Sequence, residues 1–188
     1  SLHTISQAVG INLFGGRFLH DYPRYTAASA IAEAAERLTP EEGEPTPRLF
    51  QLTLGALRAL AAREHLATLV LDAYLLRSMA IAGWAPALAA CAVCGTPGRH
   101  AAFSVPAGGC VCQDCRPPGA AHPSPAALEL MAALTTGDWA VADAIPAGPR
   151  RQASGLVAAH LQWHLERGLR SLPLVDRDER PAGRGEDQ

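Results

Sequence analysis

The stretch CAVCGTPGRHAAFSVPAGGCVCQDCR, residues 91–116, holds all five cysteines of a 188-residue chain. Two C-x-x-C pairs face each other across seventeen intervening residues. This spacing is typical of a site in which four thiolates hold one zinc ion in a closed tetrahedron. The segment has few large apolar residues, so ion binding would supply its folding energy. The sequence therefore predicts a structural zinc module with Cys91, Cys94, Cys112 and Cys115 as ligands.

Two further residues of this stretch are candidate ligands. If GGCVC is a strand, Cys110 and Cys112 point to the same face, so Cys110 could substitute at the metal, although a small buried apolar role is favoured. His100 is weaker, because four thiolates already saturate the ion. Gly95 can take the positive φ that the first turn needs. Two disulfides are the alternative to a metal, but nothing else in the sequence indicates an oxidising compartment.

The rest of the chain predicts a helical body. Apolar residues make up 48% of the chain and aromatic residues only 5%, so the core is built from Ala, Leu and Val, which favours packed helices. Apolar spacing, caps and breakers predict helices over 22–38, from 47 onward, over about 64–82 with a stop at Gly83, over 125–134 and over about 151–172. The fold class is therefore mainly α, a helical bundle with the zinc module inserted and a residual strand near the N-terminus.

These elements suggest a division of the chain into consecutive parts. We expect a residual strand in 1–15, the first part of the helical body in 16–90, the zinc module in 91–118, the second helical part in 119–175 and a disordered polar tail in 176–188. The Pro-rich run after the module serves as a stiff linker. The apolar stretch 66–90 is interrupted by Asp72 and Arg77, so we expect no membrane span. No basic leader precedes the first apolar residues, and we expect a cytoplasmic protein.

Positive charge is carried entirely by arginine, and the net charge of the chain is −2. Any patch that attracts phosphate must therefore be local. The candidate nucleic-acid contacts are Arg99 and Arg116 on the module and Arg150 and Arg151 at the start of the last helix, with Arg167 and Arg170 near its end. If their faces converge, they would give a salt-dependent affinity that does not depend on base sequence. An ordinary solvated surface is the alternative interpretation.

No arrangement for catalysis can be argued from the residues. His160 and His164 share a helix face, and His164 with Glu166 has the H-x-E form found in zinc deaminases. In those enzymes this motif precedes the cysteine pair, whereas here the order is reversed. We expect the two histidines to lie at the edge of the core beside Trp163, and we expect no enzymatic activity.

Five segments together resemble the bacterial DNA-repair protein family RecO, in its actinobacterial form. They are LHTISQAV (2–9), DYPRYTAASAIAEAAERL (21–38), LDAYLLRSMAIAGWAPALAACAVCG (71–95), GGCVCQDC (108–115) and GLVAAHLQWHLERGLRSLPLV (155–175).

The resemblance implies an N-terminal OB-fold, of which we expect this chain to hold only a residual strand, followed by a helical domain with a zinc module. It implies binding of single- and double-stranded DNA, annealing of complementary strands, and work with RecR and single-strand-binding protein to help load RecA, in the cytoplasm at the nucleoid. The acidic, aromatic-ended tail of single-strand-binding protein would suit an apolar groove flanked by arginine. The alternative is a helical protein-interaction scaffold with a structural zinc ribbon and no nucleic-acid role, which the near-neutral charge favours.

Overall fold

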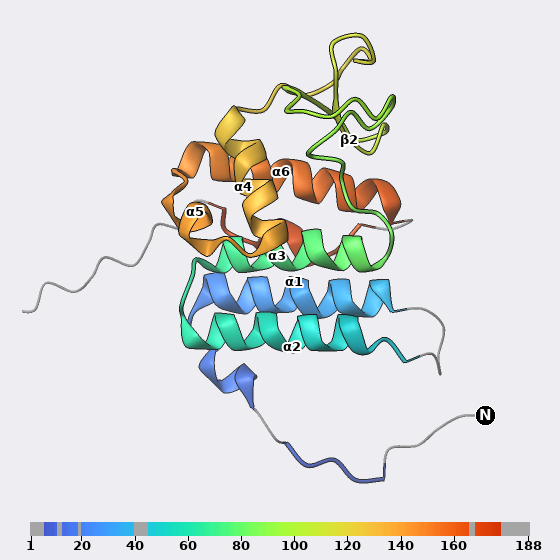
Figure 1. Cartoon of the computed structure of the whole chain (residues 1–188). Helices are drawn as coiled ribbons and strands as arrows, with labels where there is room; N and C mark the ends of the chain where they lie inside the picture. Colours follow the sequence, from blue (N-terminus) through green and yellow to red (C-terminus); the bar gives the residue numbers. More distant parts are fainter. Residues whose placement is uncertain (1–5, 11–12, 19, 40–44, 166–167, 178–188) are drawn as a thin grey trace, which may run out of the picture.

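The computed structural model describes residues 6–10, 13–18, 20–39, 45–165 and 168–177. Helices form layers in Figure 1: α1 and α2 lie below α3, and α4, α5 and α6 lie above it. The cysteine-rich segment forms a small, mostly irregular module at the top of this stack. The mainly helical fold with a four-cysteine insertion, expected from the sequence, is confirmed.

The first three helices pack as a bundle. They are α1 (Tyr22–Leu38), α2 (Pro47–Ala62) and α3 (Ala67–Ile81). α1 has the predicted bounds because its start is encoded locally: the Asp21 side chain accepts a hydrogen bond from the Arg24 N–H (3.3 Å), and Pro23 occupies the first turn. The Arg24 side chain also donates to the carbonyls of Leu60 and His65, which fastens the start of α1 to the end of α2.

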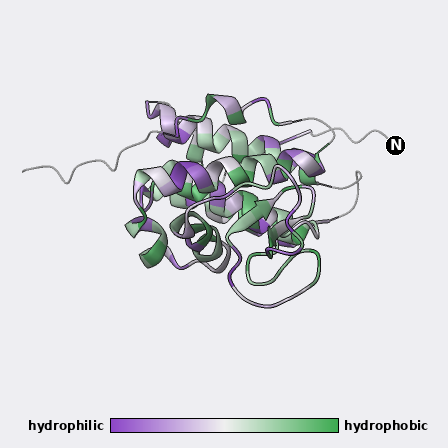
Figure 2. Cartoon of the chain, turned by 90° about the horizontal axis from the view of Figure 1, so that it is seen from above, coloured by the Kyte–Doolittle hydropathy of each residue, from purple (hydrophilic) through white to green (hydrophobic). Residues whose placement is uncertain are grey.

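The central helix α3 is buried around almost its whole circumference. It packs on α1 and α2 on one side and on α4 and α6 on the other. A helix that is apolar all round is expected at the centre of a structure, and Figure 2 shows green and purple residues mixed along the outer helices instead. Asp72 is a charged residue of α3 that is nevertheless buried, with 3% of its surface exposed.

The second half contains α4 (Pro125–Thr136), α5 (Trp139–Ala144) and α6 (Ala147–His164). The predicted cap of α4 is confirmed, since Ser124 Oγ accepts from the Ala127 N–H at 3.3 Å. The bounds predicted for the last helix were wrong: α6 begins four residues earlier and ends eight residues earlier. Pro149 is tolerated in its first turn because the first N–H groups of a helix have no partner within it.

After α6, the segment 168–177 returns across the helices and includes the short 3-10 helix η2 (Leu172–Leu174). Leu169 and Val175 of this segment are buried in the core. Glu33 of α1 accepts hydrogen bonds from the backbone N–H groups of Arg170 and Ser171, each at 2.8 Å, and a third from the Ser171 hydroxyl. The last described segment is thereby fixed to the first helix. The predicted tail falls mostly on residues 178–188, which lie outside the described residues.

The residual N-terminal strand expected over 1–15 is not found in the described part of that range. Residues 6–10 carry no regular secondary structure, and Phe14–Arg17 form the short 3-10 helix η1. A single strand is not stable without a neighbour to pair with, and no strand of the described residues lies beside this segment. The remaining residues of the expected strand, 1–5 and 11–12, lie outside the described residues.

The module is built on an antiparallel hairpin of β1 (Ala102–Ser104) and β2 (Gly109–Val111). Residues opposite each other in this hairpin share a face. The pair Phe103 and Cys110 lies in the core of the helical body, whereas the pair Ala102 and Val111 lies in a second, smaller cluster with Cys91. The hairpin therefore joins the helical core on one side to the cysteine site on the other.

Flanking segments extend this hairpin on both sides. Ala87 donates to the Gly108 carbonyl and accepts from the Cys110 N–H, while Phe103 and Ala121 exchange two backbone hydrogen bonds of 2.8 Å. The Pro-rich run, predicted to be a stiff linker, is thus docked on β1 through Ala121.

None of the helices in the described part of the chain combines the length and the hydropathy that a membrane span needs.

Candidate metal centre

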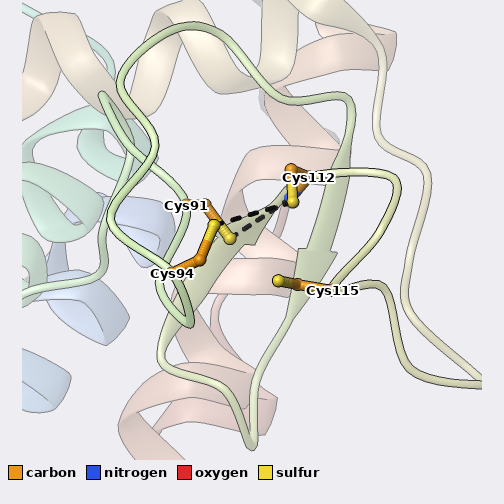
Figure 3. A group of neighbouring side chains, drawn as sticks. All are labelled: Cys91, Cys94, Cys112 and Cys115. Carbon is orange, nitrogen blue, oxygen red and sulfur yellow. Dashed lines mark hydrogen bonds between the residues drawn. The ribbon is translucent and has the colours of Figure 1, made fainter.

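Two tight turns bring the four cysteines of the C-x-x-C pairs together. In the first turn, the Gly95 N–H donates to the Cys91 carbonyl at 2.9 Å, and Gly95 has φ +74°, as predicted. The second pair follows directly after β2. In Figure 3 the side chains of Cys91 and Cys94 point from one loop toward those of Cys112 and Cys115, so the four sulfurs surround a common space.

The spacing of the sulfurs suits a tetrahedral metal ion. The four Sγ atoms all lie within 4.8 Å of one another, and those of Cys94 and Cys112 are 3.8 Å apart. Sulfurs at the corners of a tetrahedron with metal–sulfur bonds of about 2.3 Å are separated by about 3.8 Å. The donor set can therefore hold one metal ion with small adjustments. All four positions would be filled by protein, which leaves no place for substrate or catalytic water.

Local hydrogen bonds favour the thiolate form that a metal ion requires. Backbone N–H groups of Cys94 and Cys112 lower the pKa of the Cys91 thiol to about 6. A hydrogen bond from the Thr96 hydroxyl lowers the pKa of Cys94. Hydrogen bonding with the side chains of Cys112 and Cys94 raises the pKa of Cys115 to about 12, as expected where several thiols share one small space. A divalent cation would draw all four into the thiolate form.

The two additional candidates do not join this cluster. Cys110 is fully buried in the core of the helical body, and this burial raises the pKa of its thiol to about 11. The favoured interpretation of Cys110 as a buried apolar residue is confirmed. Its side chain faces away from Cys112 because β2 ends at Val111, so the strand alternation does not extend to Cys112. His100 instead donates from Nε2 to the Thr96 carbonyl at 2.9 Å.

The histidine pair of α6 lies at the joint between the module and the helices. His160 is buried, donates from Nε2 to the Trp84 carbonyl (2.9 Å) and meets Phe103 edge-on. His164 stacks on the Trp84 ring with centroids 5.1 Å apart. The expected position at the edge of the core is confirmed, but the neighbouring tryptophan is Trp84, since Trp163 is 60% exposed.

The four candidate arginines occupy two regions. Arg99 and Arg116 are exposed on the module, and Arg116 donates to His122 Nε2 at 3.5 Å. Arg150 and Arg151 lie in the first turns of α6, where they line a small hollow together with Arg177. Of the other two arginines considered, Arg170 is exposed and Arg167 lies outside the described residues.

Two residues of this hollow were not singled out by sequence. Asp72 lies at its base, where Ser154 Oγ donates to the carboxylate at 3.1 Å, and burial raises the pKa of Asp72 to about 7 despite the nearby Arg177. In the sequence, Asp72 stands out as a charge within a long apolar run, but that observation indicated only that the run does not span a membrane. No pattern in the sequence around residue 177 predicts that Arg177 lies in the same hollow as Arg150 and Arg151.

A hydrogen bond connects the segments that carry the two groups of arginines. The Ser124 N–H, at the end of the module's exit segment, donates to Gln152 Oε1 of α6 at 2.8 Å. Gln152 directly follows Arg150 and Arg151. The exit from the module and the first turns of α6, which carry Arg150 and Arg151, are therefore neighbours. Arg99 and the pair Arg150 and Arg151 nevertheless line different hollows.

A comparison with protein families matches this chain over residues 19–173 to the model described as "Recombination protein O C terminal". The match includes the helices, the four-cysteine module and all four candidate arginines. It covers most of the sequence, and it agrees with the family suggested by the motifs. RecO proteins belong to DNA repair and recombination and are recombination mediators rather than classical enzymes. The chain belongs to the RecO family of recombination proteins.

Proposed function

We propose that the four-cysteine cluster holds one structural zinc ion through Cys91, Cys94, Cys112 and Cys115. The sulfur spacing and the lowered pKa of Cys91 support this proposal. Zinc in a closed site of four thiolates contributes folding energy and no reaction chemistry. Atomic emission on the purified protein should find one zinc per chain, and the absence of any bound metal from folded protein would contradict it.

We further propose that the chain binds single- and double-stranded DNA, anneals complementary strands and helps RecA load onto strands coated with single-strand-binding protein, acting by binding and not by turnover. The family membership carries this proposal. Arg99, Arg116, Arg150 and Arg151 would contact the bound DNA. The Ser124–Gln152 contact supports a shared path for one strand, because it joins the segments that bear these arginines.

The proposed protein partners are RecR, single-strand-binding protein and, functionally, RecA, in the cytoplasm at the nucleoid. A groove of about 420 Å³ between α6 and the segment 168–177 supports the second of these. Its walls include Leu161, Leu165 and Leu172, and Arg177 lies at its edge. Such a groove offers apolar contact for an aromatic end and positive charge for an acidic tail.

Annealing of complementary strands coated with single-strand-binding protein tests the proposed function. We expect the chain to accelerate annealing, and we expect added salt to reduce the effect because phosphate contacts release counterions. Replacing Arg150 and Arg151 by alanine should lower the slope of log affinity against log salt by about 1.4 for single strands, since each contact contributes about 0.7.

The matched control replaces two exposed arginines of α2, Arg48 and Arg58, by alanine, which removes the same charge elsewhere. This control should keep the salt slope of the unaltered protein. Equal slopes for both double variants would show that Arg150 and Arg151 make no special contact. A folded, metal-loaded chain that neither binds DNA nor accelerates annealing would instead favour the interaction scaffold.

A further inference from the structure

A cavity of about 200 Å³ lies where the cysteine module meets α4. Three polar side chains line it: Arg99 and His100 come from the module, and Glu129 comes from α4. The remaining lining residues are apolar, namely Leu88, Ala101, Pro123, Pro125, Leu128 and Ala132. Apolar walls with a few polar groups from different elements are the usual composition of a ligand site.

The polar groups offer both donors and acceptors at one cavity. The Arg99 guanidinium is a donor only, and the Glu129 carboxylate is an acceptor only. His100 Nε2 donates to the Thr96 carbonyl, so in the neutral ring Nδ1 is an acceptor. A ligand that uses all three groups carries both hydrogen-bond acceptors for Arg99 and donors for Glu129 and His100, on a body with apolar surface for the walls.

We propose that this cavity receives one unpaired nucleobase of a DNA single strand. The inference rests on the proposed function, and it names the part of the DNA that the module recognises. A phosphate group would meet repulsion from Glu129 and gain nothing from the apolar walls. An apolar side chain of a protein would leave Arg99 and Glu129 without a use. An extruded base satisfies both, because its faces suit apolar walls and its edges carry hydrogen-bond donors and acceptors.

The charges of the rim imply a preference among bases. A carboxylate accepts well from an exocyclic amine, as glutamate does from cytosine N4, and an arginine donates to ring nitrogen or carbonyl acceptors. Cytosine offers both edges at once. Thymine has the same ring size but lacks the exocyclic amine, so Glu129 would have a poorer partner. The cavity should therefore favour cytosine over thymine.

The backbone of the bound strand has a route from this cavity to positive charge. Pro123 and Pro125 of the wall flank Ser124, whose N–H donates to Gln152 of α6. The turns that carry Arg150 and Arg151 thus lie next to one wall. A base in the cavity would place its neighbouring phosphates within reach of that end of α6.

Fluorescence anisotropy on the 188-residue chain tests this assignment. The labelled probes are single strands of fifteen deoxycytidines (dC15) and of fifteen thymidines (dT15). We expect dC15 to bind at least about five-fold more tightly than dT15, the lower end of what one well-formed side-chain–base pair contributes. Glu129→Leu should bring the ratio of the two affinities close to one, and both affinities should rise because a negative charge is removed. Ala132→Phe fills the cavity from an exposed helix position and should also abolish the ratio.

Two matched controls make the same changes elsewhere. Glu36→Leu and Ala32→Phe alter exposed positions of α1 and should keep the preference for dC15. Equal binding of dC15 and dT15 by the unaltered chain, or a preference that survives in both cavity variants, would overturn the assignment while leaving DNA binding intact. If Ala132→Phe keeps the preference but loses binding to single-strand-binding protein, the cavity receives a protein side chain instead. Binding of neither oligonucleotide would overturn this inference together with the proposed function.

Discussion

Replacing Phe103 by alanine tests whether the hairpin of the module is part of the helical core. Phe103 is 1% exposed, and its ring centroid lies 6.1 Å from that of His160 in an edge-on contact. Truncation of a buried phenylalanine costs about 3 to 5 kcal/mol of unfolding free energy, because apolar contact is lost and a cavity remains. In a chain of this length, that cost lowers the melting temperature by about 6 to 20 °C.

Urea unfolding followed by two signals is the suitable assay. Tryptophan fluorescence reports on the joint, since Trp84 stacks on His164 there, and a coloured chelator reports release of the metal. We expect Phe103→Ala to shift both transitions to lower urea together. Val93→Ala is the control within the module: Val93 is 61% exposed, and its truncation should cost less than about 0.5 kcal/mol.

Either of two results would refute this reasoning. A cost below about 1 kcal/mol for Phe103→Ala would mean that its burial does not hold the module to the helices. Metal release at low urea with an unmoved fluorescence transition would mean that the module unfolds independently. Joint unfolding is expected because Phe103 and Cys110 belong to the core of the helices, while Ala102 and Val111 of the same hairpin support the cysteines.

Three further predictions concern single positions. Burial raises the pKa of Asp72 to about 7, so between about pH 4 and 7 the folded state keeps a proton that the unfolded state has lost, and stability should fall as the pH rises through this range. Asp72→Asn should remove this fall and be more stable than the unaltered protein at pH 8. Thermal melting at each pH measures both effects. Cys94→Ser should lose the metal and unfold more readily, whereas Cys110→Ala should keep one metal per chain by atomic emission, because Cys110 faces the helical core. Gly109→Ala should strongly lower the unfolding free energy of the protein, measured by chemical denaturation, because φ is +148° and a Cβ would lie 2.4 Å from the Ala87 carbonyl oxygen. Gly155→Ala, on the exposed side of α6, should raise it by about 0.5 to 1 kcal/mol. Similar effects at the two glycines would contradict the structure.

Elements whose signals are local could be predicted from the sequence. The range 22–38 was obtained with its bounds because Asp21, Pro23 and the apolar spacing all act within that segment. The cluster of four cysteines was predicted because each C-x-x-C turn brings two sulfurs together and the two pairs have the spacing of a single four-ligand site. Ser124 was identified as a cap for the same reason.

Features that depend on distant contacts could not be predicted. The short α5 is too brief for a periodic pattern, and its start depends on the Asp138 side chain accepting from the Val141 N–H. The burial of Cys110 follows from the docking of the whole hairpin against the helices, which no spacing within 91–116 encodes. Likewise Asp72 and Arg177 are neighbours only because the chain returns over α3 at its end.

The attachment of the segment 168–177 to Glu33 has a consequence for synthesis of the chain. The partners of Glu33 lie 137 and 138 residues later in the sequence. At about 5 to 20 residues per second, the ribosome needs roughly 7 to 27 s to make that interval. The first helices can pack together during this time, since α1, α2 and α3 are consecutive. The Glu33 carboxylate stays hydrated until its partners Arg170 and Ser171 have been synthesised. The nascent chain therefore passes through a stage in which its first bundle is assembled and one edge of α1 is still uncovered, and translation speed sets how long that stage lasts.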